Sequence, residues 1–107
     1  MFDALEKSLL VLERLVPVEA RIRQRSASLA KQLSDASESI ALNLGEGRQR
    51  RDGDRRRHYE MAAGSAGEVT VALRIALAKR YITAAELAQV DAVLDPVRAM
   101  LYRLARR

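Results

Sequence analysis

The chain has 107 residues, enough for one domain, and no cysteine, which excludes disulfide bonds and thiolate chemistry. Its single histidine argues against a transition-metal site made of protein side chains alone, so we expect no metal and no cofactor. Nineteen Lys and Arg against fourteen Asp and Glu give a net charge of +5, and the N-terminal segment has neither a basic start nor an apolar run long enough for a signal peptide or membrane span.

The first predicted helix begins at Asp3, which has the spacing of a capping box with Glu6. Apolar residues then recur at intervals of three and four, as in the seams of four-helix bundles. This predicted seam consists of Phe2, Leu5, Leu9, Leu12 and Val16. Pro17 interrupts it, so the helix either ends near Val16 or kinks and continues to Arg25.

The second predicted helix runs from about Ser26 to Glu46, with Ser26 or Ser28 as its N-cap. The apolar face of this second amphipathic segment carries Ile22, Leu29, Leu33, Ala36, Ile40 and Leu44. Glu46 falls in the last turn, where the negative end of the helix dipole disfavours a carboxylate. We therefore expect Glu46 to be compensated by a downstream arginine or by the start of the next helix, and Gly47 to end the helix in a left-handed conformation.

The segment 48–57 holds six arginines and two aspartates, and is the most basic run in the chain. The arginines are Arg48, Arg50, Arg51, Arg55, Arg56 and Arg57. Asp52-Gly53 is a turn signal, and Asp54 is a suitable N-cap for the third helix. These features predict a basic loop at one end of the molecule.

The third predicted helix has an apolar face of Tyr59, Ala62, Ala66, Val69, Leu73 and Ala76. Between Ala62 and Gly67 no side chain is larger than serine, and two glycines inside a helix cost about 1 kcal/mol each. We expect a neighbouring backbone to come close there; a phosphate loop is disfavoured, because no strand precedes the segment and no lysine follows it at the required spacing. Glu68 is either an exposed charge or a partner of one of the loop arginines.

The fourth predicted helix starts with a capping box of Thr83 and Glu86 and a hydrophobic staple of Ile82 with Leu87. Its seam is Leu87, Val90, Leu94, Val97, Leu101 and Leu104. Four such helices predict an all-α fold, an antiparallel up-down four-helix bundle in which 1–107 is a single domain. Further apolar residues lie off the seams, which predicts self-association. They are Leu10, Val11, Leu42, Val71, Ile75, Val93 and Met100.

Three motifs follow one another at characteristic distances. They are Asn43-x-x-Glu46-Gly47, then Ala62-Ala63-Gly64-Ser65-Ala66-Gly67-Glu68, then Tyr81-Ile82. In these motifs the chain resembles the four-helix-bundle family of proteins encoded in intervening sequences of bacterial 23S ribosomal RNA, whose relatives include the accessory variability determinant of diversity-generating retroelements. The resemblance implies a pentameric ring, nucleic-acid or reverse-transcriptase binding in some relatives, and structural roles for Asn43, Glu46, Gly47, Gly64, Ser65 and Glu68. Two positions depart from the family pattern, His58 in place of a bulky aromatic residue and Ala41-Leu42 before the asparagine.

Three functions are compatible with these residues. All but three of the nineteen basic residues are arginine, which binds phosphate bidentately, so the first is a cytoplasmic homo-oligomer that grips RNA or DNA through a basic rim formed by the six arginines of 48–57. The second is a protein-interaction adaptor, and the basic residues could also be an unpartnered solvated surface. The third is an enzyme using His58, which we disfavour because no second acid or base and no carboxylate cluster accompanies it.

Overall fold

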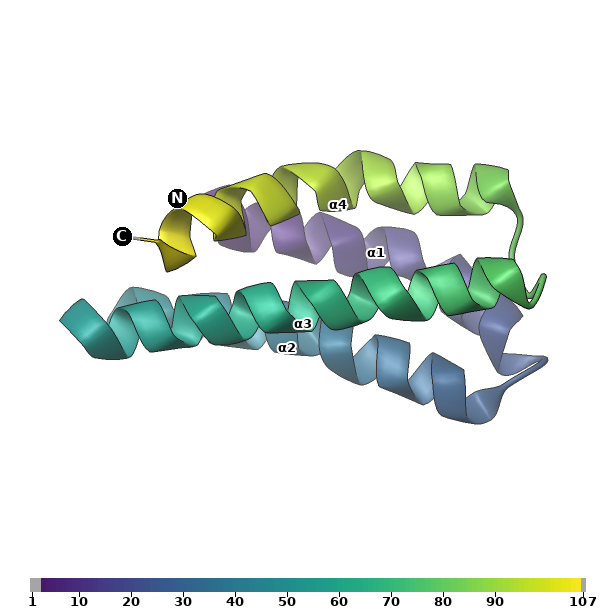
Figure 1. The fold of residues 1–107 in the computed structure, drawn as a ribbon, viewed down its shortest axis with the longest axis horizontal. Helices are drawn as coiled ribbons and strands as arrows, with labels where there is room; N and C mark the ends of the chain where they lie inside the picture. Colours follow the sequence, from purple (N-terminus) through teal and green to yellow (C-terminus); the bar gives the residue numbers. More distant parts are fainter. Residues whose placement is uncertain (1–2, 107) are drawn as a thin grey trace.

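The computed structural model describes residues 3–106, which form four α-helices and no strand. The helices are α1 (Asp3–Arg23), α2 (Ala27–Gln49), α3 (Asp52–Ala78) and α4 (Ala84–Ala105). They lie side by side along a longest extent of 42 Å, with the α2–α3 link near both ends of the chain and the other two links at the opposite end (Figure 1). Each helix packs against the next and α1 packs against α4, so the four surround one core. The predicted all-α fold is confirmed.

The core is built from the faces that the sequence predicted for α2, α3 and α4. Their central seam residues, among them Leu33, Leu73 and Leu94, are fully buried. The predicted capping box of α4 is also confirmed, because the Thr83 hydroxyl accepts from the Glu86 N–H at 3.1 Å and the Glu86 carboxylate accepts from the Thr83 N–H at 2.8 Å. For these three helices, periodicity alone identified the buried side.

The seam predicted for the first helix is wrong. Leu9 and Val16 are exposed, Leu5 and Leu12 are half-buried, and Phe2 lies outside the described residues. The buried face is instead Ala4, Ser8, Val11, Leu15, Val18 and Ile22. Both seams have spacings of three and four, but only the second continues with core-forming residues past Pro17 to the end of the helix.

The helix continues through Pro17, whose exposed position lets α1 run on to Arg23. The continuation of the helix past Pro17 is confirmed, and the helix ends two residues earlier than Arg25. Ser26 then caps α2, its hydroxyl accepting from the backbone N–H of Leu29 at 3.2 Å. The capping residue is therefore Ser26 and not Ser28.

Several large apolar side chains remain on the surface. Of the seven residues predicted off the seams, Leu10, Leu42, Val71 and Ile75 are exposed, and Leu42 keeps 68% of its surface. Val11 is instead a core residue, and Val93 and Met100 are partly buried against the core. Leu9, Val16, Met61 and Tyr102 add to the exposed set.

α3 contains a window of 18 residues with a mean hydropathy of 1.3, long and apolar enough by composition to cross a membrane. A single helix of this kind is weak evidence for a span, because helices in the core of a bundle meet the same criterion. The buried face of α3, from Tyr59 to Ala76, packs into the core formed with the other helices.

Candidate functional site

The basic segment is mostly helical, and the predicted ten-residue loop is wrong. α2 extends to Gln49 and α3 begins at Asp52, so only Arg50 and Arg51 link the two helices. Asp54 lies inside the first turn of α3, and the N-cap position belongs to Arg51, whose side chain makes no capping hydrogen bond. The chain reverses through Asp52, which has a positive φ of 52°, a conformation that aspartate tolerates better than most residues. We call this part of the molecule, with the six arginines of 48–57, the arginine end.

Gly47 does not end α2, which is a second correction. No glycine in residues 3–106 has a positive φ, and Gly47 lies buried within the helix. A Cβ at this position would come within 2.6 Å of Cε1 and 2.9 Å of Cδ1 of the Tyr59 ring. The glycine is therefore required by the close approach of α3 to α2. Tyr59 can pack into the core only where α2 presents no side chain.

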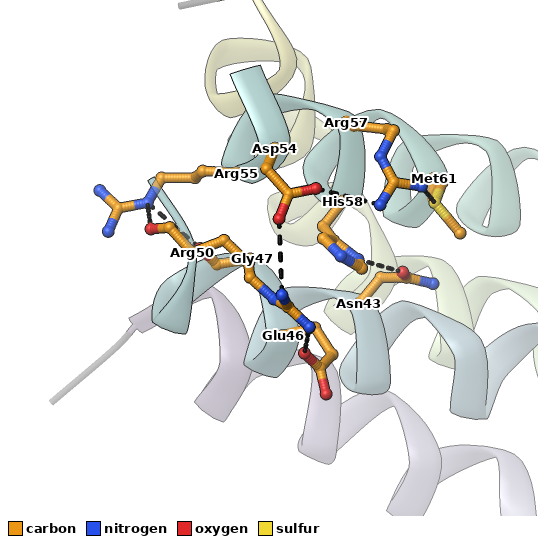
Figure 2. A network of polar contacts seen from close by, with 9 residues as sticks. All are labelled: Asn43, Glu46, Gly47, Arg50, Asp54, Arg55, Arg57, His58 and Met61. Carbon is orange, nitrogen blue, oxygen red and sulfur yellow. Dashed lines mark hydrogen bonds and ion pairs between the residues drawn. The ribbon is translucent and has the colours of Figure 1, made fainter. Parts of the chain in front are cut away.

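A chain of ion pairs crosses the α2–α3 link (Figure 2). Arg50 lies between two carboxylates, 3.2 Å from Glu46 Oε2 and 3.7 Å from Asp54 Oδ2. Arg57 in turn donates to Asp54 at 3.0 Å, and its second nitrogen lies 3.8 Å from the sulfur of Met61. The pKa of Asp54 is lowered from its ordinary value, chiefly by the hydrogen bond from Arg57. The expected compensation of Glu46 is confirmed, with Arg50 as its partner.

Arg55 caps the C-terminus of α2. Its Nε donates to the carbonyl oxygens of Gly47 at 3.1 Å and Arg50 at 2.9 Å, and its terminal nitrogen donates to that of Arg48 at 3.2 Å. The last carbonyls of a helix have no partner within the helix, and a cation there also offsets the negative end of the dipole. Arg55 therefore holds the start of α3 against the end of α2, and much of its donor capacity is used inside the molecule.

A second polar chain joins α2 to α3 beside the ion pairs. The hydroxyl of Ser65 donates to that of Ser39 at 2.8 Å, and the Nδ2 of Asn43 donates to the same hydroxyl at 3.1 Å and to the Ser39 carbonyl at 3.0 Å. The Oδ1 of Asn43 is then the acceptor that faces His58 Nδ1 at 3.0 Å, so Nδ1 carries the proton. Asn43 is thus a bridge between helices, and His58 is held by it.

The remaining arginines of this end face outward. Within residues 3–106 the one ion pair of Arg56 is with Glu60, one turn away at 3.5 Å, and both side chains are more than half exposed. Arg51 is exposed, and its side chain has no hydrogen-bond or ion-pair partner between residues 3 and 106. Arg48 is also exposed. Arg50 and Arg55 therefore hold the α2–α3 junction, whereas Arg51 and Arg56 are presented to solvent.

The fold brings two more arginines to this end. The last turn of α4 lies beside the start of α3, where Leu104 lines a cavity of about 320 Å³ together with Asp52, Arg55, Arg56 and Tyr59. Arg103 and Arg106 of this turn are exposed. The guanidinium of Arg106 lies 4.0 Å from the ring centroid of Tyr102. An even number of helices puts both chain ends beside the second link, which brings these two arginines to the arginine end.

The small-residue stretch of α3 has no close neighbour at its glycines. A Cβ on Gly64 or Gly67 would meet nothing within 4 Å, so the expected backbone contact is absent there among residues 3–106. Both glycines line an open groove of about 760 Å³ between α2 and α3. Glu68 lies exposed in this groove and forms no ion pair within the described part of the chain, so of its two alternatives the exposed charge is confirmed.

Nothing at this end resembles a metal centre. Between residues 3 and 106 no three side chains of the His, Cys, Asp or Glu type are grouped so that they could hold an ion. His58 has Asn43 as its partner and no carboxylate beside it in hydrogen-bond range. The chemistry available here is the binding of anions by guanidinium groups.

Comparison with known proteins agrees with the fold. The family model described as 23S rRNA-intervening sequence protein matches residues 2–103. A crystal structure of a protein of unknown function from the S23 ribosomal protein family of Bacteroides thetaiotaomicron superposes with a TM-score of 0.88 at 20% sequence identity, covering 97% of this chain and 99% of that one. No curated protein sequence matches the chain. Neither description indicates catalysis.

Proposed function

The chain belongs to the family of 23S rRNA-intervening sequence proteins, and on that premise we propose that it is a homo-oligomeric module that binds the phosphate backbone of RNA or DNA through the arginine end. The proposal rests on the observation that the arginines of this end have different roles. Arg50 and Arg55 hold the helix junction, while Arg51 and Arg56 are left at the surface with no strong internal partner. A guanidinium in that position is available for bidentate contact with a phosphate.

In this proposal the protein contacts the phosphate backbone of the nucleic acid and not its bases. Few aromatic faces are available near the arginines, since Tyr59 is buried and Tyr102 is covered on one face by Arg106. Sequence-specific recognition of single strands depends on bases stacking on such rings. We therefore expect weak sequence preference and a strong dependence of affinity on salt.

Self-association is the second part of the proposal. The exposed Leu42, Val71 and Ile75 lie on the two helices that form the open glycine-lined groove, and Leu9, Leu10 and Val16 are exposed on α1. Large apolar side chains left at the surface in this number are a reason to propose an interface. In the proposed assembly, antiparallel up-down bundles associate into a ring, a pentamer by family resemblance. Several arginine ends in one ring would raise affinity by about 10²- to 10⁴-fold through avidity.

The proposed module acts in the cytoplasm, without a cofactor and without catalysis of its own. Its test is a fluorescence-anisotropy titration of structured RNA and of duplex DNA across a salt series. The rim variant Arg51→Gln/Arg56→Gln should lower the salt slope by about 2, since two phosphate contacts are lost. The matched control Arg14→Gln/Arg74→Gln removes the same charge away from the arginine end and should keep the slope of the wild type.

Failure of wild-type binding at low salt would contradict the proposal. The basic rim would then suit an acidic protein surface, and a role as an adaptor for a protein partner becomes the better hypothesis. The two roles differ in a competition experiment, because RNA displaces a partner that occupies the same arginines. Sedimentation or light scattering that gave the mass of one chain at micromolar concentration would contradict the oligomeric part separately.

A further inference from the structure

The end of the bundle opposite the arginine end is also basic. It is formed by the α1–α2 link and the α3–α4 link, which lie close together although they are far apart in the sequence (Figure 1). Tyr81 belongs to the α3–α4 link, and its ring centroid lies 5.4 Å from the guanidinium carbon of Arg25, in the α1–α2 link, and 6.0 Å from the Nζ of Lys79. We call Arg25, Lys79, Arg80 and Tyr81 the Tyr81 end.

Arg80 occupies a backbone position that usually belongs to glycine. Its φ is +63°, and the turn after α3 is closed by the N–H of Tyr81 donating to the Ala76 carbonyl at 2.8 Å and the N–H of Arg80 donating to the Leu77 carbonyl at 3.0 Å. This is the Schellman arrangement, in which glycine avoids the steric cost of a Cβ. A non-glycine residue held in that conformation is a reason to look for a function of its side chain. The Arg80 side chain is exposed and has no partner between residues 3 and 106.

The carboxylates of this end do not neutralise the cluster. Glu86 is held by its capping box with Thr83 and lies 3.7 Å from Arg21. Glu19 has a pKa that burial raises and that the charge of Arg23 partly lowers again. Glu86 is thus close to Arg21, and Glu19 is influenced by the charge of Arg23. The charges of Arg25, Lys79 and Arg80 remain available to bind an external anion.

The helix dipole does not account for Arg80. α1 and α3 both end here, and a cation near a helix C-terminus is favourable. Lys79 already supplies that charge at the C-cap of α3, and a glycine at position 80 would close the same turn without strain. A side chain that reaches outward and binds an external anion is a sufficient reason for an arginine at this position.

We propose that the Tyr81 end is a second phosphate-binding surface, which holds a separate nucleic-acid segment at the far end of the bundle. The inference rests on the proposed function of the arginine end and extends it. The longest extent of the molecule is 42 Å, so a segment bound at one end leaves the other accessible. Each protomer would then join two segments, and the protein would bridge nucleic acids.

A two-duplex capture experiment tests this inference. A biotinylated RNA duplex is immobilised, protein is bound, and retention of a second, fluorescent duplex of unrelated sequence is measured at low salt. The Tyr81-end variant Lys79→Gln/Arg80→Gly should bind the first duplex but retain about tenfold less of the second, because two phosphate contacts are lost. Its melting temperature should not fall, since glycine relieves the turn at position 80. The control Lys7→Gln/Arg14→Gln removes equal charge away from this end and should retain the second duplex as the wild type does.

The outcomes separate the two proposals. Retention of the second duplex by the Tyr81-end variant at the wild-type level overturns the inference and leaves the arginine end as the only binding surface. Capture of the first duplex with no second duplex retained by the wild type also overturns the inference alone. A wild type that captures no duplex at all overturns both. Loss of bridging in both the Tyr81-end variant and the rim variant, with single-duplex capture kept in each, supports two independent surfaces.

Discussion

The two ends of the bundle use their arginines differently. The arginine end has six in ten residues, yet two of them hold α2 to α3, Arg55 on carbonyl oxygens and Arg50 on carboxylates, and Arg57 is paired with Asp54 of its own helix. The Tyr81 end has fewer cations, and they lie against an aromatic ring or, at Arg80, in a strained turn with no internal partner. The density of arginine in a sequence is therefore a poor measure of the positive charge that a surface offers. The positive charge that a surface offers depends on whether its arginines already contact carbonyl oxygens, carboxylates or aromatic rings within the protein.

The largest expected effect comes from filling the space that lets the arginine end close. Gly47→Ala places a Cβ 2.6 Å from the buried Tyr59 ring, so we expect a loss of about 2 kcal/mol in the free energy of unfolding, after allowing for the better helix propensity of alanine. Gly45→Ala is the matched control, because its Cβ would meet nothing within 4 Å and should add about 0.5 to 1 kcal/mol. Urea unfolding of both variants measures the difference. Equal stabilisation by the two alanines would contradict the account of Gly47.

Substitutions of Arg55, which caps α2, and of Arg51 should have different effects on stability and on RNA binding, although both residues lie at the arginine end. Arg55→Gln removes a side-chain donor from three carbonyl oxygens, of which that of Gly47 keeps the backbone N–H of Arg50, and we expect a loss of about 1 kcal/mol, reduced by the access of water to this surface. Arg51→Gln, four residues earlier, should leave the unfolding midpoint unchanged while it weakens RNA binding. Thermal melts and anisotropy on the two variants test the division. A melting temperature lowered equally by both would refute it.

The polar chain beside the ion pairs can be interrupted at its centre. Asn43→Ala leaves His58 Nδ1 without its partner in a half-buried interface and removes the side-chain donor to Ser39, for an expected loss of about 1 kcal/mol. Asn43→Asp keeps the acceptor that faces His58 but not the donor to Ser39, and should fall between the wild type and the alanine variant. Chemical denaturation at neutral pH gives the order of the three. An alanine variant as stable as the wild type would show that water replaces the asparagine without cost.

The smallest effect belongs to the opposite end and depends on pH. The pKa of Glu86 is lowered from its ordinary value of 4.5, first by the hydrogen bond from the Thr83 backbone N–H. A carboxylate with a lowered folded pKa stabilises the protein fully above its unfolded pKa and loses that contribution as the pH falls through the folded value. Glu86→Gln should therefore cost about 0.5 kcal/mol at pH 7 and nothing at a pH below the folded pKa. Melting temperatures of both proteins from pH 7 to pH 2 would disprove this if their difference stayed constant.

Much of the fold could be predicted from the sequence because its signals are local. Capping at Ser26 and Thr83 depends on side chains within one turn, and the faces of α2, α3 and α4 follow from a single apolar stripe on each. α1 carries two stripes of equal spacing up to Pro17, so the pattern before the proline does not identify the buried side. Val18 and Ile22, beyond the proline, continue only the stripe that is buried.

The site was predicted less well, and for related reasons. Gly47 and Asp54 were interpreted as helix boundaries from local preference, whereas the approach of Tyr59 and the cap by Arg55 extend α2 and start α3 earlier. The pairing of Glu46 was predictable because its partner lies one turn away. Arg103 joins the arginine end only through the packing of α4, which no local pattern reports.

The central claim is that exposed arginines at the two ends contact phosphate. Footprinting with an arginine-selective reagent such as phenylglyoxal, read by mass spectrometry with and without bound RNA, tests it at every position at once. If these arginines contact phosphate, RNA should slow the modification of Arg51, Arg56 and Arg80. The modification rate of Arg14, in the middle of α1, should stay unchanged. Equal protection of Arg14 and the end arginines, or no protection of Arg51 and Arg56 under conditions where RNA is bound, would contradict it.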